Sequence, residues 1–123
     1  MTDQRDDLHI RQGATWPGLM WPIFAPADGV TPLDLTGWTA RAQVRPDATS
    51  PTLYWTWSTA PAAGEGTAEI IGHEVGIELT AAESAQFGWG GPAGYDLELT
   101  SPDGRVLIVA AGAVHITRNY TRE

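Results

Sequence analysis

The sequence of 123 residues contains no cysteine, and this absence removes three kinds of chemistry together. The chain can form no disulfide, carries no thiolate nucleophile and offers no zinc–thiolate site. A chain without thiols is also indifferent to its redox compartment, so its location has to be inferred from other features.

Basic residues are few and scattered. The chain has seven arginines and no lysine, against 15 acidic residues, which gives a formal net charge of −8. A nucleic-acid-binding surface needs clustered Lys and Arg to displace counterions from the phosphates. The sequence therefore predicts no nucleic-acid partner.

Long hydrophobic runs are also absent. No apolar stretch approaches the roughly 18 residues that a membrane-spanning helix requires, and the first seven residues are polar and acidic, unlike a secretory signal. Apolar residues nevertheless make up 42% of the chain and charged residues only 18%, which is typical of a folded globule. We expect one domain over residues 1–123, with no membrane partner, that stays where it is made until it is assembled.

Two stretches show the period of two that is typical of a half-buried strand. From Trp38 to Arg45, and again from Tyr95 to Thr100, apolar and polar residues alternate. The run SPDG at 101–104 follows the second stretch, with a proline that presets φ and a glycine that tolerates positive φ. It predicts a hairpin to the next strand.

Further strand-like runs occur at short spacing between turn signals. They are residues 8–12, 52–58, 67–71, 74–79, 105–110 and 113–118. Thr80 and Glu83 match a capping box, which predicts one short helix near residues 81–87. The predicted fold class is all-β: an immunoglobulin-like antiparallel β-sandwich of about seven to nine strands with one short helix.

The segment 1–32 is expected to be irregular. Its apolar residues between positions 13 and 27 are interrupted by Pro17, Gly18 and Pro22. Proline cannot donate to a strand ladder, so this stretch is predicted to be an edge strand or a bulged extended segment.

The alternation also predicts which side chains point inward. A register slip of one residue would expose the whole set, so the prediction is strict. The predicted inward residues are Trp38, Ala40, Val44, Leu53, Trp55, Val75, Ile77, Leu79, Phe87, Tyr95, Leu97, Leu99, Val106, Ile108, Val114 and Ile116.

No pattern of catalytic or metal-binding residues stands out. His9, His73 and His115 are far apart in the sequence, without the spacing of a metal motif. No serine lies in a nucleophile elbow, and the glycine-rich stretch 88–94 lacks the Lys and Ser/Thr of a phosphate loop. The outward pairs Asp96/Glu98 and Glu74/Glu78 resemble solvated sheet faces. We expect no enzyme activity, no catalytic residue, no metal and no cofactor.

Six tryptophans are the most unusual feature of the composition. Those on inward positions are expected in the core. Others are open to three interpretations: covering of the sheets, contact with a protein partner, or stacking on a sugar ring. The candidate protein-interface residues are Trp16, Leu19, Met20, Trp21, Phe24 and Trp89.

Three motifs in order carry a family resemblance. They are DLTGWTARAQVR from Asp34, VGIELTAAES from Val75, and GYDLELTSPDGR from Gly94. With them the chain resembles minor structural proteins of tailed bacteriophages, of the LtfC-like β-sandwich type, and is similar also to the N-terminal domain of phage baseplate upper proteins. The resemblance covers about residues 8–118. It implies an immunoglobulin-like sandwich in the virion, with no catalytic residues.

The expected function is therefore that of a non-enzymatic virion structural protein, a minor tail, fibre, baseplate or head–tail component that acts through protein–protein assembly. It would be made in the host cytoplasm and present in multiple copies beside other virion proteins in a symmetric particle. The alternative is a carbohydrate-binding or host-surface adhesion module that uses Trp16, Trp21 or Trp89 as stacking platforms. The docking prediction places part of the assembly surface on residues 1–32, because their apolar area is too large to leave in water.

Overall fold

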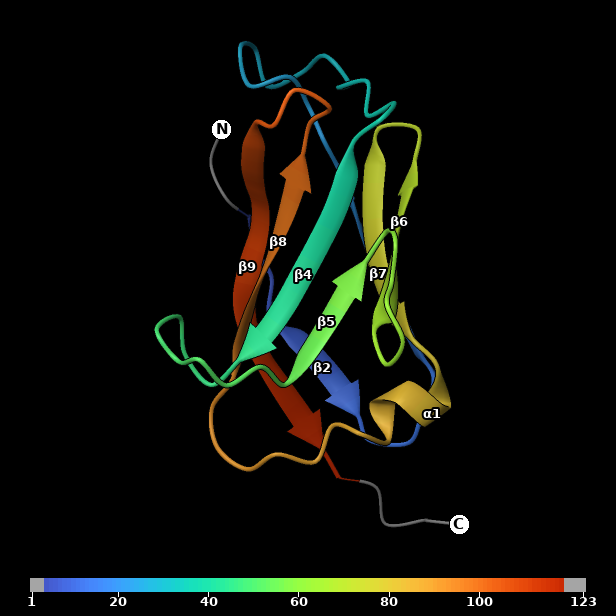
Figure 1. Cartoon of the computed structure of the whole chain (residues 1–123), viewed down its shortest axis with the longest axis vertical. Coiled ribbons are helices and arrows are strands. Elements are labelled where there is room, and N and C mark those ends of the chain that lie inside the picture. Colours follow the sequence, from blue (N-terminus) through green and yellow to red (C-terminus); the bar gives the residue numbers. More distant parts are fainter. Residues whose placement is uncertain (1–3, 119–123) are drawn as a thin grey trace.

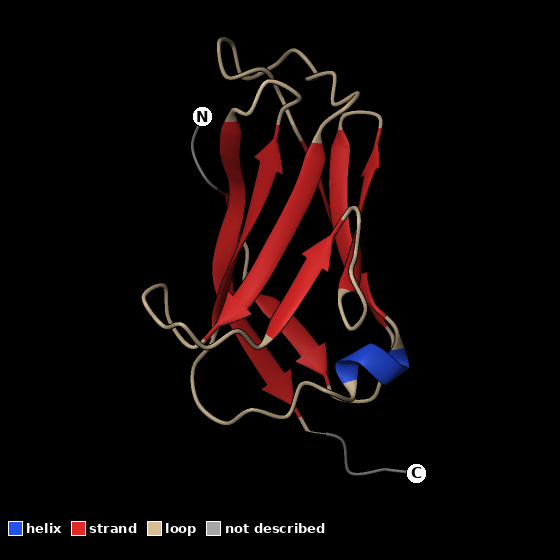
Figure 2. Cartoon of the chain, viewed as in Figure 1, coloured by secondary structure: helices blue, strands red, loops and turns tan. Residues whose placement is uncertain are grey.

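The computed structural model describes residues 4–118, and within them the chain is all-β with one short helix (Figures 1 and 2). This confirms the predicted class, the number of strands and the single helix. The strands are β1 (Gln4–Arg5), β2 (Leu8–Arg11), β3 (Trp16–Pro22), β4 (Thr39–Arg45), β5 (Trp55–Ser58), β6 (Gly66–Ile71), β7 (Glu74–Leu79), β8 (Gly94–Thr100) and β9 (Val106–Thr117), and α1 is Ala81–Ser84.

All the strands belong to one mixed sheet that curls nearly into a closed barrel. Its order is β1-β9-β8-β4-β5-β6-β7-β3, and β2 also pairs with β9. In Figure 1, β9, β8, β4 and β5 lie side by side across the front, and β6 and β7 lie to their right. The expectation of purely antiparallel pairing is wrong for three pairs of strands, because β1 and β2 run parallel to β9 and β5 runs parallel to β6.

The link between β5 and β6 is short, and a glycine permits it. Only Trp57 with Gly66 and Ser58 with Thr67 are paired there. A Cβ on Gly66 would lie 2.9 Å from Trp55 Nε1 and from Trp57 Cδ1. The absence of a side chain therefore lets β6 approach the two indoles, and this contact joins the front strands to β6, β7 and β3.

The hairpin of β8 and β9 forms where the sequence predicts it. The Ser101 amide donates to the Arg105 carbonyl (2.8 Å), and Gly104 closes the turn with φ of 92°. The prediction of two separate strands at 105–110 and 113–118 is wrong, because β9 continues through residues 111–112. A register shift opposite Leu97 and Glu98 occurs instead.

This shift also explains two errors in the predicted inward set. Leu99 is fully buried and lies opposite Leu107, so Leu107 points inward and Val106 is 53% exposed. Ile108 lies opposite the outward Glu98 and is only half-buried. Val109 and Ala110 fill the core in their place, because the bulge changes which residues face inward.

The rest of the inward set is largely confirmed. Leu97 and Leu99 are buried, whereas Asp96 is exposed and Glu98 is half-buried. Trp38 and Ile116 are partly buried against the core, and Leu53 is wrong at 44% exposed, because it precedes β5 in a loop. The other predicted members are buried: Ala40, Val44, Trp55, Val75, Ile77, Leu79, Phe87, Tyr95 and Val114.

The segment 1–32 is more regular than the sequence predicts. It contains β1, β2 and β3, and Leu8 and Ile10 of β2 are fully buried against β9. The expectation for residues 13–27 is confirmed in detail, since β3 is the last strand of the sheet order and has a register shift between Trp16 and Leu19. Gly18 makes this irregularity possible, because its φ is +85° and a Cβ would lie 1.9 Å from the Ile77 carbonyl oxygen.

Helix α1 connects β7 to β8 and begins at the predicted capping box. The Thr80 hydroxyl accepts from the Glu83 amide (3.1 Å), and the Glu83 carboxylate accepts from the Thr80 amide (2.9 Å). Ser84 fixes the helix to the N-terminal segment by donating to the Ala14 carbonyl at 2.6 Å. In residues 4–118 there is no helix long and apolar enough to cross a membrane.

Candidate functional site

The six candidate interface residues do not form one patch. Trp21 is 3% exposed, and its indole donates to the Asp6 carboxylate at 2.7 Å. Trp16, Phe24 and Trp89 are partly buried, whereas Leu19 is 38% exposed and Met20 is 44% exposed. Of this set, Leu19 and Met20 on β3 offer the apolar area that is open to a partner.

Trp16 and Trp89 contact other aromatic rings of the same chain. Trp89 stacks on Tyr54 with ring centroids 4.5 Å apart, and its ring also lies 4.7 Å from that of Phe87. Phe87 contacts Trp55 and Trp57, and Trp57 contacts Trp16. These six rings form one connected cluster that holds the loop after α1 against β5 and β3.

The outward side of β6, β7 and β3 forms a second surface, which we call the acidic face. Pairing between the strands arranges it in rows, and the central row is Met20, Gly76 and Glu69. The row nearer the turn that joins β6 to β7 is Pro22, Glu74 and Ile71, and Ile71 is 60% exposed. Glu78 and Thr67 complete the face on the other side of the central row.

The charge of the acidic face is of one sign. Strands β3, β6 and β7 contain Glu69, Glu74 and Glu78 and no Lys or Arg. On the outer side of β4 and β8, by contrast, Arg41 lies opposite Glu98, and Arg45 follows on the same strand. The sequence holds a signal for this asymmetry that the alternation does not reveal: no Lys or Arg occurs between Arg45 and Arg105.

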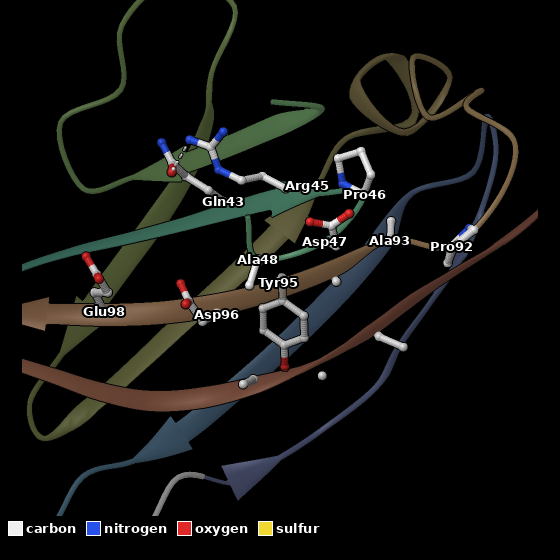
Figure 3. Close-up of a pocket in the computed structure, with 14 residues that line it drawn as sticks. Gln43, Arg45, Pro46, Asp47, Ala48, Pro92, Ala93, Tyr95, Asp96 and Glu98 are labelled. Atoms are coloured by element: carbon white, nitrogen blue, oxygen red, sulfur yellow. Dashed lines mark hydrogen bonds between the residues drawn. The ribbon is translucent and has the colours of Figure 1, made fainter. Parts of the chain in front are cut away.

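A hollow of about 560 Å³ lies over the outer side of β4, β8 and β9 (Figure 3). Asp96 and Glu98 point to this side of β8, and Tyr95 points away. Small residues make the hollow, because Gly94 lies between Arg45 of β4 and Ala113 of β9 in the register.

The charged groups around the hollow hold the protein's own loop. The Arg45 guanidinium donates to the Ser50 and Pro51 carbonyls, each at 3.2 Å, and to Gln43 Oε1 at 3.1 Å. Hydrogen bonds from Thr49, of which the one from its hydroxyl has the largest effect, hold the pKa of Asp47 below its usual value. Among the described residues that line the hollow there is no Ser, Thr, Cys, His or Lys.

The structure brings two histidines together that are far apart in the sequence. His9 of β2 and His115 of β9 are register partners, and their rings stack at 4.9 Å. Asp7 lies 3.4 Å from His115 Nε2. No group of three or more His, Cys, Asp or Glu within residues 4–118 is placed to hold a metal ion. The parallel pairing of β2 with β9, which the sequence does not reveal, causes this juxtaposition.

Exposed aspartates with lowered pKa values shape loops in this protein. The Thr31 hydroxyl and the Thr31 and Val30 amides all donate to Asp28, and they lower its pKa from 3.8 to about 2. Thr36 lowers the pKa of Asp34 in the same way, again mainly through its hydroxyl. Each of these carboxylates closes a turn, which gives the shift a structural cause.

Neither the models of known protein families nor the curated proteins include a match to this chain. In the described part of the chain, Leu19 and Met20 form an exposed apolar edge beside a face whose carboxylates have no ion-pair partner.

Proposed function

We propose that the chain is a non-enzymatic structural protein of a tailed-bacteriophage virion, a minor tail, fibre, baseplate or head–tail component that acts through protein–protein assembly. The observation that carries the proposal is the order of three local structures. The Asp34 turn precedes β4, the capping box of α1 follows β7, and the turn at 101–104 joins β8 to β9. These are the positions at which the three phage-like motifs of the sequence stand.

The strand order supports an immunoglobulin-like sandwich as the finer description of the fold. One group of strands is β9-β8-β4-β5, and the other is β6-β7-β3, with only the two-residue link between β5 and β6. In variable-type immunoglobulin domains the same succession appears as strands G, F, C and C′ beside D, E and B. The helix between β7 and β8 stands where those domains connect strand E to strand F.

Assembly would use the exposed part of the N-terminal segment. Leu19 and Met20 lie on the edge strand β3, with Trp16 and Phe24 partly exposed near its two ends. Aromatic and Met side chains are enriched in the buried cores of protein interfaces. The partners would be other virion proteins in a particle that holds several copies of the chain, and the net negative charge speaks against the packaged nucleic acid.

The sugar-binding alternative has less support. A stacking platform needs an open ring face, but Trp21 is buried and Trp89 is stacked on Tyr54. A glycan array is the direct check on this alternative, with Trp16→Ala and Trp89→Ala as the variants that should abolish any specific binding.

The test of the proposed function follows a tagged chain into particles. The chain is produced in a host during phage infection, and particles are purified on a density gradient. We expect it to sediment with the particles at a constant ratio to a known tail protein. A chain that remains entirely in the unsedimented fraction would contradict the proposal.

A pair of variants tests the docking edge within the same experiment. Removing residues 1–24 would not do so, because Leu8 and Ile10 of β2 are core residues. Leu19→Ser combined with Met20→Ser changes only exposed side chains, and it should reduce entry into particles about tenfold. Leu53→Ser, in the loop before β5 and with the same exposure as Met20, is the control and should enter normally.

A further inference from the structure

We propose that the acidic face, the outward side of β6, β7 and β3, docks a basic protein surface with an apolar residue at its centre. This inference rests on the proposed function and specifies the chemistry of the virion partner. It adds Glu69, Ile71, Glu74 and Glu78 to the docking edge at Leu19 and Met20.

The centre of the face is apolar because one side chain lies over a glycine. Met20 is paired with Gly76, and a Cβ on Gly76 would lie 2.0 Å from the Met20 sulfur. The thioether therefore crosses the middle strand β7 at the position where a side chain is missing, and Met20 is still 44% exposed. An unbranched thioether of this kind adapts its shape to an apolar partner.

The rim around this centre is negative and uncompensated. Glu69 is the neighbour of Gly76 on β6, and Glu74 and Glu78 lie two residues to either side of Gly76 on β7. None of the three carboxylates forms an ion pair or a side-chain hydrogen bond with another residue in the described part of the chain. Like charges gathered on one sheet face repel each other, and Lys or Arg side chains from a partner would relieve that repulsion.

A second copy of the chain fits this face less well than a basic partner does. A two-fold symmetric contact would set three carboxylates against three others, which electrostatics opposes. On β4, Arg45 is bonded to Gln43 and to its own loop, and Arg41 lies opposite Glu98 in the register.

Strand addition is also disfavoured at this edge. Pro17 and Pro22 have no amide hydrogen, and the irregularity at Gly18 interrupts the edge of β3. Docking through side chains on the sheet face remains the mode that the residues favour.

The composition of the chain provides a sharp test. A water-soluble carbodiimide joins a carboxylate to a primary amine, and this chain has no lysine. In purified particles, a crosslink from Glu69, Glu74 or Glu78 to a lysine must therefore lead to a different protein. We expect such crosslinks to appear in peptide mass spectrometry, and to one type of partner.

Charge-neutral variants provide the second measurement. Purified chain is mixed with particles that were assembled without it, and binding is measured by co-sedimentation at rising salt. Glu69→Gln with Glu78→Gln should weaken binding about tenfold and flatten its salt dependence. Asp47→Asn with Asp103→Asn removes the same charge from two distant turns, keeps an acceptor oxygen in each, and should leave binding unchanged. Circular dichroism and melting confirm that all variants are folded.

The outcomes separate this inference from the proposed function. If the chain is in particles but crosslinks only from other carboxylates, or if both double variants bind alike, the acidic face is not the docking surface and the virion assignment stands. Enhanced dimerisation of the Glu69→Gln/Glu78→Gln variant with unchanged particle binding would favour a second copy and overturn the inference. A chain absent from particles overturns the proposed function itself.

Discussion

Trp55 and Trp57 of β5 differ in whether the indole N–H has a hydrogen-bond acceptor. Trp57 donates its indole hydrogen to the Glu78 carbonyl at 2.8 Å, and this bond joins β5 to β7. The Trp55 indole nitrogen is buried and has no acceptor among the described residues. The same residue type therefore stabilises the fold at one position and leaves a polar group unsatisfied at the other.

Trp57→Phe should consequently destabilise the protein more than Trp55→Phe. Both changes remove similar volume from one aromatic cluster, but only the first removes the donor to the Glu78 carbonyl in a partly buried hydrogen bond. We expect the free energy of unfolding to fall by about 1–3 kcal/mol more for Trp57→Phe, as measured by denaturant titration. Equal losses for the two variants would show that the bond to Glu78 contributes nothing.

We expect the stability of the loop at 25–32 to depend on pH through Asp28. Hydrogen bonds from Thr31 and Val30 hold the pKa of Asp28 at about 2, below the value of 3.8 expected in an unfolded chain. The folded loop therefore prefers the ionised carboxylate, so its stabilisation is complete above the unfolded pKa and is lost as the pH falls from 3.8 through about 2.

An NMR titration of the Asp28 carboxyl carbon measures this directly. Thr31→Val removes the hydroxyl that contributes most to the shift, so the pKa should rise toward 3.8. Thr36→Val is the matched control, because that hydroxyl bonds to Asp34 and should leave Asp28 unchanged. An Asp28 pKa near 3.8 in the unchanged protein would show that the turn does not form as described.

At the scale of elements, local patterns predict local structure well. β7 and β8 have the bounds that alternation gives them, and α1 begins at Thr80 because two side chains satisfy its first amides. The bulge in β9 is missed, because its cause is the pairing with β8 and not a pattern within β9 itself. Parallel pairing is missed for the same reason, since strands far apart in sequence carry no mark of their mutual direction.

The irregularity of β3 gives a prediction at this scale. Gly18 has φ of +85°, and a Cβ would overlap the Ile77 carbonyl oxygen at 1.9 Å, so Gly18→Ala adds both strain and a clash. We expect the free energy of unfolding to fall by about 3 kcal/mol or more. Gly29→Ala is the control, because φ is +69° but no atom lies within 4 Å, and it should cost only about 1 kcal/mol. Similar costs for both would mean that β3 does not approach β7 as closely as this.

At the scale of the whole molecule, charge and apolar area are distributed unequally. The sequence predicts an N-terminal docking element rich in aromatic residues, but most of those rings pack into the core or into the cluster of six. Burial depends on contacts with β7, β5 and the loop after α1, which no residue pattern within 1–32 specifies. What remains at the surface is a smaller apolar edge beside a face of carboxylates.

The most direct measurement of the virion assignment is a cryo-electron microscopy map of purified particles from a phage that encodes the chain. We expect density for this domain at a symmetric set of positions, with the side of β6, β7 and β3 turned toward a neighbouring protein. A map that accounts for every ordered component of the particle without this domain would contradict the assignment.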